Sequence, residues 1–238
     1  LRLTNVLLTN NLLKRNSKVD RILGSGSVTV DFLDMLGAAN ENHKVNYNLN
    51  LSYNRTYVKD LTFVPAFIQS TTNYLTKSNE TLVKEYRDYS TSLLENFITY
   101  DGNFGRNHLN VVAGTSFQRD LHQRVTSRGI NLTEPYYLQV GNALETDSES
   151  YEEESVLWSY FGRVNYDFDQ KYLLSATIRQ DGSSRLSPDD NQDLFPAASV
   201  GWRIDRESFF PVDKSLISLF KVRGSYGEVG NIFNLLPY

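Results

Sequence analysis

The chain has 238 residues, no cysteine and a formal net charge of −4, from 24 Lys and Arg against 28 Asp and Glu. The lack of cysteine excludes disulfide scaffolds and cysteine-ligated metal sites, and a slightly acidic chain offers no basic field for nucleic acid. No run of about 18 apolar residues is present, so a helical membrane span is excluded as well. The 13% of aromatic residues, mostly Tyr and Phe, suits strands and interfacial belts.

The N-terminal half predicts strands. We expect an exposed loop over 1–19, then strands at 21–35, 44–58, 85–100 and about 109–117. The second of these strands carries an asparagine on alternate positions, at Asn46, Asn48, Asn50 and Asn54. Each buried amide needs hydrogen-bond partners, so this ladder fits a wet lumen better than a soluble core.

The stretch from 155 to 231 predicts four further strands, with apolar residues on every second position. These positions are Val156, Trp158, Tyr160, Val164, Tyr166, Phe168, Tyr172, Leu174, Ala176, Ile178, Ala198, Val200, Trp202, Ile204, Phe220, Val222, Gly224 and Tyr226. A period of two indicates half-buried antiparallel strands. We expect Pro196 to begin the third of them, where its missing N–H is tolerated.

The two faces of these strands favour a transmembrane barrel over a soluble β domain. Arginines stand near mid-strand on the polar face, and large aromatics gather near the strand ends on the apolar face. Outer-membrane barrels have an apolar band toward lipid, aromatic girdles and a polar lumen.

The lengths of the connections point the same way. Short turns are expected near 37–43, 101–107 and 167–170, and long connections near 59–84, 125–154 and 180–195. Outer-membrane barrels alternate short periplasmic turns with long extracellular loops. The connection 205–219 should be periplasmic but is longer than this rule predicts.

The amino-acid sequence of the C-terminal stretch resembles that of one protein family. The segments SYFGRVNYDFDQKYLLSATIRQDGSSRL, FPAASVGWRI, ESFF and KVRGSYGEVGN follow one another between Ser159 and Asn231. They resemble the barrel of the SusC/RagA family of TonB-dependent outer-membrane transporters of Bacteroidetes, and ITYD, LNVVAG and DRILG extend the resemblance upstream. Leu186 and Ala197 depart from the aromatic residue and the serine that are usual at these positions.

The resemblance implies an all-β fold, in which residues 1–238 are an antiparallel transmembrane β-barrel segment of about eight strands. The whole barrel would have about 22 strands around a plug. The plug domain, the signal peptide and the remaining barrel strands are expected to lie outside this sequence.

The same resemblance implies active import of glycan oligosaccharides or peptides by an integral, multi-pass barrel in the cell outer membrane. A SusD-like surface lipoprotein would cap the mouth, and the TonB–ExbB–ExbD complex would act through the missing parts. Outer-membrane lipid would surround the barrel. No cofactor and no nucleic acid is expected.

The family-motif positions are the candidate site residues. They are Arg163, Arg179, Asp181, Gly182, Ser183, Ser184, Arg185, Arg203, Arg223, Gly230 and Asn231. The DGSSR segment favours turn chemistry, with cargo or subunit contact by Arg179 and Arg185 as the alternative. The polar-face arginines are expected to pair with Asp and Glu across the lumen or against the plug, and cargo contact is again the alternative.

Catalysis and metal binding have little support in the sequence. The acidic stretches 145–154 and 189–193 could bind calcium, but they lack the glycine and bidentate acid of a calcium loop, which favours solvated loops. His43, His108 and His122 have no helical metal spacing, and there is no G-x-S-x-G elbow. We therefore expect no enzyme.

Two other functions remain open from the residues. A passive porin or adhesin could use a similar barrel, and a plug domain in the parent protein would argue against it. A soluble all-β carbohydrate-binding module would place stacking aromatics in loops, where Tyr136 and Tyr137 are the obvious pair.

Overall fold

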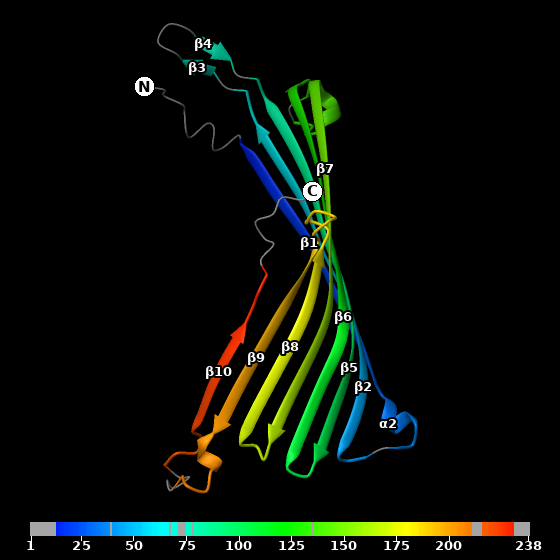
Figure 1. Cartoon of the computed structure of the whole chain (residues 1–238). Helices are drawn as coiled ribbons and strands as arrows, with labels where there is room; N and C mark the ends of the chain where they lie inside the picture. Colours follow the sequence, from blue (N-terminus) through cyan, green and yellow to red (C-terminus); the bar gives the residue numbers. More distant parts are fainter. Residues whose placement is uncertain are drawn as a thin grey trace. The chain divides into compact units, whose positions relative to one another are not determined.

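Eight antiparallel strands form one sheet in the computed structural model, which describes residues 13–38, 40–66, 68–70, 75–77, 79–134, 136–210 and 216–230. The strand order is β1-β2-β5-β6-β7-β8-β9-β10 (Figure 1). The bounds are β1 Lys14–Asp31, β2 His43–Val64, β5 Thr81–Phe104, β6 Asn107–Leu132, β7 Ala143–Phe168, β8 Tyr172–Ser183, β9 Gln192–Arg203 and β10 Lys221–Gly227. The predicted all-β, antiparallel fold of about eight strands is confirmed.

Short elements lie between these strands. They are α2 Phe32–Met35, η1 Val140–Asn142, η2 Ile204–Arg206, and a separate two-stranded sheet of β3 Ile68–Ser70 with β4 Leu75–Lys77. Among the described residues, α2 is one turn long and no helix has the length and apolarity to cross a membrane.

The chain divides into two compact units that share the long strands. Unit 1 holds residues 1–23, 54–91 and 120–154, and unit 2 holds residues 24–53, 92–119 and 155–238. Each unit therefore contains its own portions of β1, β2, β5, β6 and β7, while β8, β9 and β10 belong to unit 2 alone.

The strand register of unit 2 aligns the apolar positions of neighbouring strands. Val164 lies opposite Ala176, and Ala176 lies opposite Ala198. Leu174 lies opposite Val200, which in turn lies opposite Gly224. Because residues opposite each other project to the same side of a sheet, the apolar residues form one continuous face, as the period of two predicted.

Unit 1 contains the buried apolar core of the described residues. Phe63, Leu82 and Leu132 are buried together, and partly buried Leu61, Leu138, Val140 and Ala143 pack around them. These residues come from the ends of β2, β5 and β6, from the segment before β7 and from the first residue of β7. The core therefore ties the strand ends of unit 1 to one another.

Several predicted boundaries are wrong, mostly because the strands are longer than expected. The predicted loop over 125–154 is mainly strand, since β6 continues to Leu132 and β7 begins at Ala143. β2 likewise runs to Val64, and β1 includes residues 14–19. In residues 14–19 and 143–154 polar residues occupy both faces, so the alternation that marks a half-buried strand is missing there.

Two local predictions are also wrong. The predicted strand 21–35 ends at Asp31, whose carboxylate accepts hydrogen bonds from the N–H groups of Leu33 (3.0 Å) and Asp34 (3.2 Å) and caps α2. β9 begins at Gln192, so Pro196 lies inside the strand. The Pro196 carbonyl accepts from the Glu228 N–H just beyond the end of β10, so its missing N–H faces an edge where the ladder has stopped.

Candidate functional site

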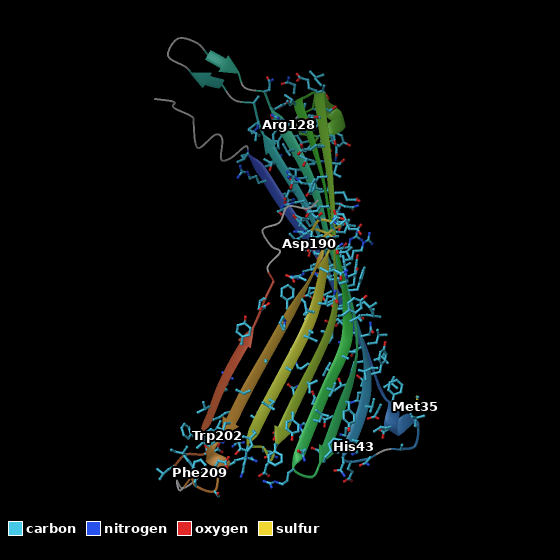
Figure 2. The ribbon with its side chains drawn as sticks, in the orientation of Figure 1. Met35, His43, Arg128, Asp190, Trp202 and Phe209 are labelled. Carbon is cyan, nitrogen blue, oxygen red and sulfur yellow. The ribbon has the colours of Figure 1, made fainter. Side chains whose placement is uncertain are left out.

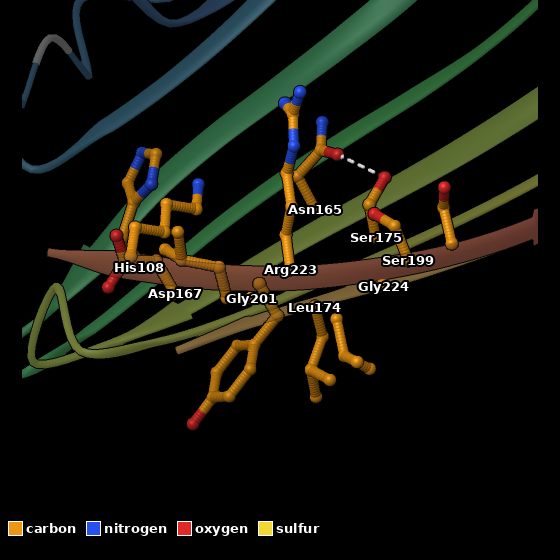
Figure 3. A pocket seen from close by; sticks show the side chains of 14 residues that line it. His108, Asn165, Asp167, Leu174, Ser175, Ser199, Gly201, Arg223 and Gly224 are labelled. Atoms are coloured by element: carbon orange, nitrogen blue, oxygen red, sulfur yellow. Dashed lines mark hydrogen bonds between the residues drawn. The ribbon is translucent and has the colours of Figure 1, made fainter. Parts of the chain in front are cut away.

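The polar face of unit 2 forms a hollow near the short turns. Its lining includes His108, Asn165, Asp167, Ser175, Ser199, Lys221, Arg223 and Ser225. Figure 3 shows Arg223, Asn165 and Ser175 on one side of the strands and Leu174 on the other. The Ser175 hydroxyl donates to Asn165 Oδ1 (2.7 Å), whose Nδ2 donates to Asn110 (3.2 Å). The hollow therefore offers fixed amides and hydroxyls beside two cationic side chains.

Two arginines farther along this face contact neighbouring strands or their own strand. Arg163 Nε donates to Thr177 Oγ1 across the ladder (3.3 Å). Arg179 donates to Asp181 (2.6 Å) and Ser159 (2.7 Å), and its guanidinium lies 5.8 Å from the Phe161 ring centroid. These cations are held close to the sheet.

Arg203 differs from the prediction of a mid-strand position. It is the last residue of β9 and donates to Asp205 at 3.2 and 2.6 Å. The guanidinium of Arg203 holds the pKa of Asp205 below its ordinary value. Arg179 and Arg203 thus each pair with an aspartate two residues away in the sequence, and pairing across a lumen or with a plug stays a prediction.

The DGSSR segment is built into the end of β8. A Cβ on Gly182 would lie 2.2 Å from the Trp158 indole, so only glycine leaves room for that ring. Ser183 is buried, and its hydroxyl accepts from the Arg185 N–H (3.2 Å). The Ser184 N–H donates to the Val156 carbonyl (2.9 Å), and its hydroxyl accepts from the Val156 N–H (2.8 Å). These contacts shape the turn that leaves the sheet.

The remaining motif positions are not gathered into one site. Arg223 lies on β10 and lines the polar hollow, whereas Arg185 lies beyond the end of β8. A Cβ on Gly230 would lie 2.4 Å from the Phe195 ring, so this glycine permits a close approach. Asn231 lies outside the described residues. The motif is therefore spread along the strands of unit 2.

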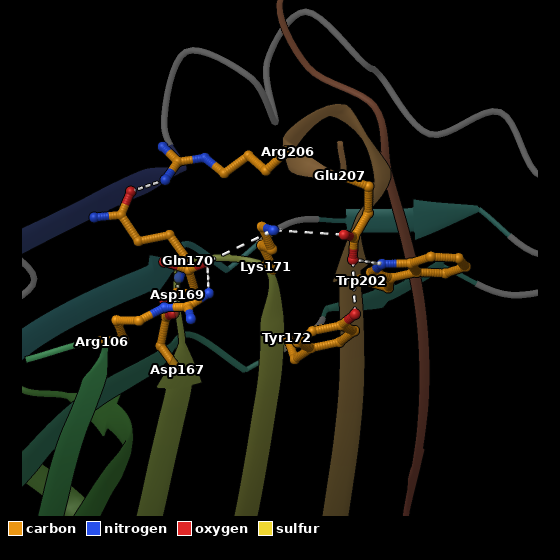
Figure 4. Close-up of polar contacts among 9 residues, drawn as sticks. All are labelled: Arg106, Asp167, Asp169, Gln170, Lys171, Tyr172, Trp202, Arg206 and Glu207. Atoms are coloured by element: carbon orange, nitrogen blue, oxygen red, sulfur yellow. Dashed lines mark hydrogen bonds and ion pairs between the residues drawn. The ribbon is translucent and has the colours of Figure 1, made fainter. Parts of the chain in front are cut away.

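Sequence reasoning missed a polar network at the turn end of unit 2 (Figure 4). Glu207 accepts from the Tyr172 hydroxyl (2.7 Å) and the Trp202 indole N–H (3.0 Å), and Lys171 Nζ lies 3.5 Å from its other oxygen. The Tyr172 hydroxyl, and then the Trp202 indole, hold the pKa of Glu207 below its ordinary value. One feature of the sequence could have pointed to this network: Glu207, the acid of the ESFF segment, follows the girdle residue Trp202 by five residues.

The same turn contains a second cluster. Arg106 pairs with Asp169, whose pKa the guanidinium lowers, and Lys171 lies 3.6 Å from the same carboxylate. Arg106 also covers the Phe168 ring at 5.0 Å. These contacts connect the β5–β6 turn to the β7–β8 turn.

Unit 1 carries a different network, whose members Glu85 and Arg87 were expected in the strand 85–100 and Asp60 in the connection 59–84. Arg87 pairs with Asp60 and lies 3.0 Å from Glu85, which also pairs with Arg124 (3.0 Å). The Ser17 hydroxyl, and then Arg87, lower the pKa of Asp60.

Unit 1 also holds an aromatic cluster, which begins two residues along the strands from Arg87 and Arg124. The His122 ring stacks on Tyr89 at 4.2 Å and meets Tyr151 edge-on at 5.8 Å. The proposed stacking pair Tyr136 and Tyr137 lies apart from this cluster, exposed in the connection between β6 and β7.

Among the described residues, no group of three or more His, Asp or Glu side chains is arranged to hold a metal ion. The acidic stretch 145–154, predicted to be a solvated loop, lies in β7, while residues 189–191 lie in the β8–β9 connection. The polar contacts described above therefore line a surface of the sheet or fix the ends of its strands.

Comparison with known proteins assigns the family. A profile of the family "TonB dependent receptor-like, beta-barrel" matches residues 5–235. The chain belongs to this family. The relatives of this TonB-dependent receptor segment, which include SusC and RagAB, also confirm the predicted resemblance to the SusC/RagA family.

Curated relatives of this receptor segment include TonB-dependent receptor P3 of Formosa agariphila, which is 35% identical over 157 residues, covering 65% of this chain and 16% of that protein. TonB-dependent receptor SusC of Bacteroides thetaiotaomicron is 31% identical over 146 residues, covering 59% of this chain and 14% of SusC. The chain thus spans about a sixth of the length of such relatives.

Solved structures share the fold of the receptor segment. The RagAB peptide transporter superposes with a TM-score of 0.68 at 12% identity, covering 91% of this chain and 23% of that chain. The open-open state of the RagAB peptide importer gives 0.71 at 13% identity over the same shares. The family comprises receptors and transporters and not enzymes.

Proposed function

We propose that this chain is a wall segment of a SusC/RagA-like transporter in the outer membrane. In this proposal the apolar face of unit 2 contacts lipid and its polar face lines the lumen. The observation that carries it is the alternation of apolar and polar residues along the same strands. Leu174, Ile178 and Val200, which alternate with Ser175, Arg179 and Ser199, are each about half exposed. An exposed apolar face of several strands is typical of contact with lipid.

The cargo we propose is glycan oligosaccharide or peptide. The support is likeness alone: SusC is among the relatives, and the RagAB structures are titled as a peptide transporter and importer. The polar hollow, with its amides, hydroxyls and two cations, can hydrogen-bond either class. Parts of the whole transporter outside this chain would supply the rest of the selectivity for cargo.

We further propose that the whole barrel has about 22 strands around a plug. Among the described residues, β1 and β10 each have a sheet neighbour on one side only, which supports this, because an open sheet edge in a membrane leaves backbone groups without partners. A SusD-like surface lipoprotein would cap the mouth, and TonB–ExbB–ExbD would energise import.

Uptake by cells tests the transport proposal. Strains lacking the full-length receptor, and strains lacking TonB function, would be given labelled peptides and oligosaccharides. Loss of uptake of one cargo class in both strains is expected. Uptake that needs the receptor but not TonB would instead show a passive pore, and a receptor found in the soluble fraction would overturn the membrane proposal.

A further inference from the structure

The connection between β9 and β10 is too long and too apolar for an ordinary periplasmic turn. It spans the residues between Arg203 and Lys221, and its described parts are 204–210 and 216–220. Phe209 is 63% exposed and Leu216 is 81% exposed, and Leu219 is similarly exposed. Water-facing turns seldom present such side chains together.

Phe209 extends the apolar face of unit 2 beyond the strands. Its ring meets the Trp202 ring edge-on, with the centroids 6.2 Å apart. Trp202 stands on the apolar face, because it lies opposite Tyr172 on β8 and Val222 on β10. Figure 2 shows Trp202 and Phe209 at the same end of the strands. The apolar surface is therefore continuous from β9 into the connection.

The polar ends of the girdle rings are fixed by the connection itself. The Tyr172 hydroxyl and the Trp202 indole N–H both donate to the Glu207 carboxylate, while the bodies of the two rings stay partly exposed (Figure 4). Rings with an apolar body and a satisfied polar tip are suited to the boundary between acyl chains and headgroups. Glu207 thus places a carboxylate two residues from the exposed apolar ring of Phe209.

We propose that residues 204–210, the described start of the β9–β10 connection, form an interfacial anchor: Phe209 inserts into the acyl boundary of the periplasmic leaflet, and Glu207 holds this segment against the girdle. The partner is the lipid bilayer, because the patch continues the face that the proposed function assigns to lipid. Phe209 then adds apolar contact with the membrane beyond the end of β9. This inference rests on the proposed function.

Spin labels on the full-length receptor in lipid vesicles test the anchor. Nitroxides would be placed by Phe209→Cys, Ser208→Cys and Val200→Cys, with any other cysteine of the parent protein replaced. The label at 209 should collide with oxygen as the Val200 label does, and several-fold less with an aqueous nickel chelate than the exposed Ser208 label.

Two results would overturn the anchor while leaving the transporter intact. One is a label at 209 as accessible to the nickel chelate as that at 208, with 200 still in lipid. The other is a label at 209 that neither reagent reaches, which would mean that protein covers the site. A label at 200 in water would instead overturn the proposed function.

The role of Glu207 has its own readout. Glu207→Ala should move the label at 209 toward water while the label at 200 stays in lipid. Glu207→Gln keeps an oxygen that accepts from Tyr172 and Trp202, so it should leave the label at 209 near its original depth. No shift with Glu207→Ala would show that Glu207 does not position the connection.

Discussion

Units 1 and 2 use the same long strands but distribute their apolar residues in opposite ways. In unit 2 large apolar side chains such as Val200 and Ile178 stay exposed on one face. In unit 1 the apolar side chains Phe63, Leu82 and Leu132 are buried against one another. An apolar face that remains exposed needs an apolar surrounding, whereas a small internal core suits a part that stands in water.

The polar residues show the same contrast. On β2 the run of apolar residues at every second position is first interrupted after Tyr53 by Arg55, which pairs with Asp88 (Nε to Oδ1, 3.0 Å). On β7 the corresponding run ends at Val156, and Glu152 accepts from Gln123 (2.5 Å). The membrane boundary that we propose therefore falls between these positions, where unit 2 gives way to unit 1 along the chain.

Placing a charge on the apolar face gives the largest expected effect. Ile178→Arg should cost about 2–4 kcal/mol, because Ile178 lies near the middle of β8, six residues from the girdle residue Tyr172. Thr146→Arg, at an exposed position of β7 in unit 1, should change the free energy of unfolding by less than about 0.5 kcal/mol. Urea unfolding of the full-length receptor in lipid vesicles would measure both. Equal costs would remove the distinction between the units.

Steric crowding on the same face should give the next largest effect. Gly182→Ala would bring a methyl group onto the Trp158 indole, and overpacking of this kind costs about 1–3 kcal/mol. Gly162→Ala, on β7 inside the sheet, is the matched control, because the nearest atom to a Cβ on Gly162 is Ile178 Cγ2 at 3.6 Å, an ordinary contact distance. The same unfolding measurement applies. A cost for Gly162→Ala as large as that for Gly182→Ala would show that crowding is not the cause.

The fold of unit 2 could be predicted because one face of its strands is apolar, so period two is clear in residues such as Tyr172, Leu174 and Ala176. In unit 1 polar residues stand on both faces of the strands. The strand that holds His122 was therefore expected to end near that residue, whereas β6 continues to Leu132. The strand signal fades where neither face is consistently apolar.

The polar networks around Glu207 and Asp60 could not be predicted from the sequence for a different reason. Glu207 meets Tyr172 across 35 residues of sequence, and Asp60 meets Arg87 across 27. Such pairs depend on strand register and turn geometry, which periodicity does not fix. The arginine positions were visible in the sequence, but their partners Asp181, Thr177 and Ser159 required the ladder.

The smallest expected effect concerns the ion pairs of unit 1 and appears as a pH dependence. Asp60 has a lowered pKa in the folded chain because the Ser17 hydroxyl and Arg87 favour its charged form. The resulting stability is present above the ordinary carboxyl pKa of about 3.9 and is lost as the pH falls through the lower folded value. For a partly exposed pair this amounts to about 0.2–1 kcal/mol.

Asp60→Asn should therefore unfold with a weaker dependence on pH in the acid range than the wild type, and added salt should narrow the difference. Val200→Ala, on the apolar face of unit 2, should shift stability without changing that dependence, since it adds and removes no charge. Unfolding curves at a series of pH values would compare the three proteins. Parallel curves for Asp60→Asn and the wild type would show that unit 1 draws no stability from this pair, which would leave its buried apolar core to hold the strand ends together.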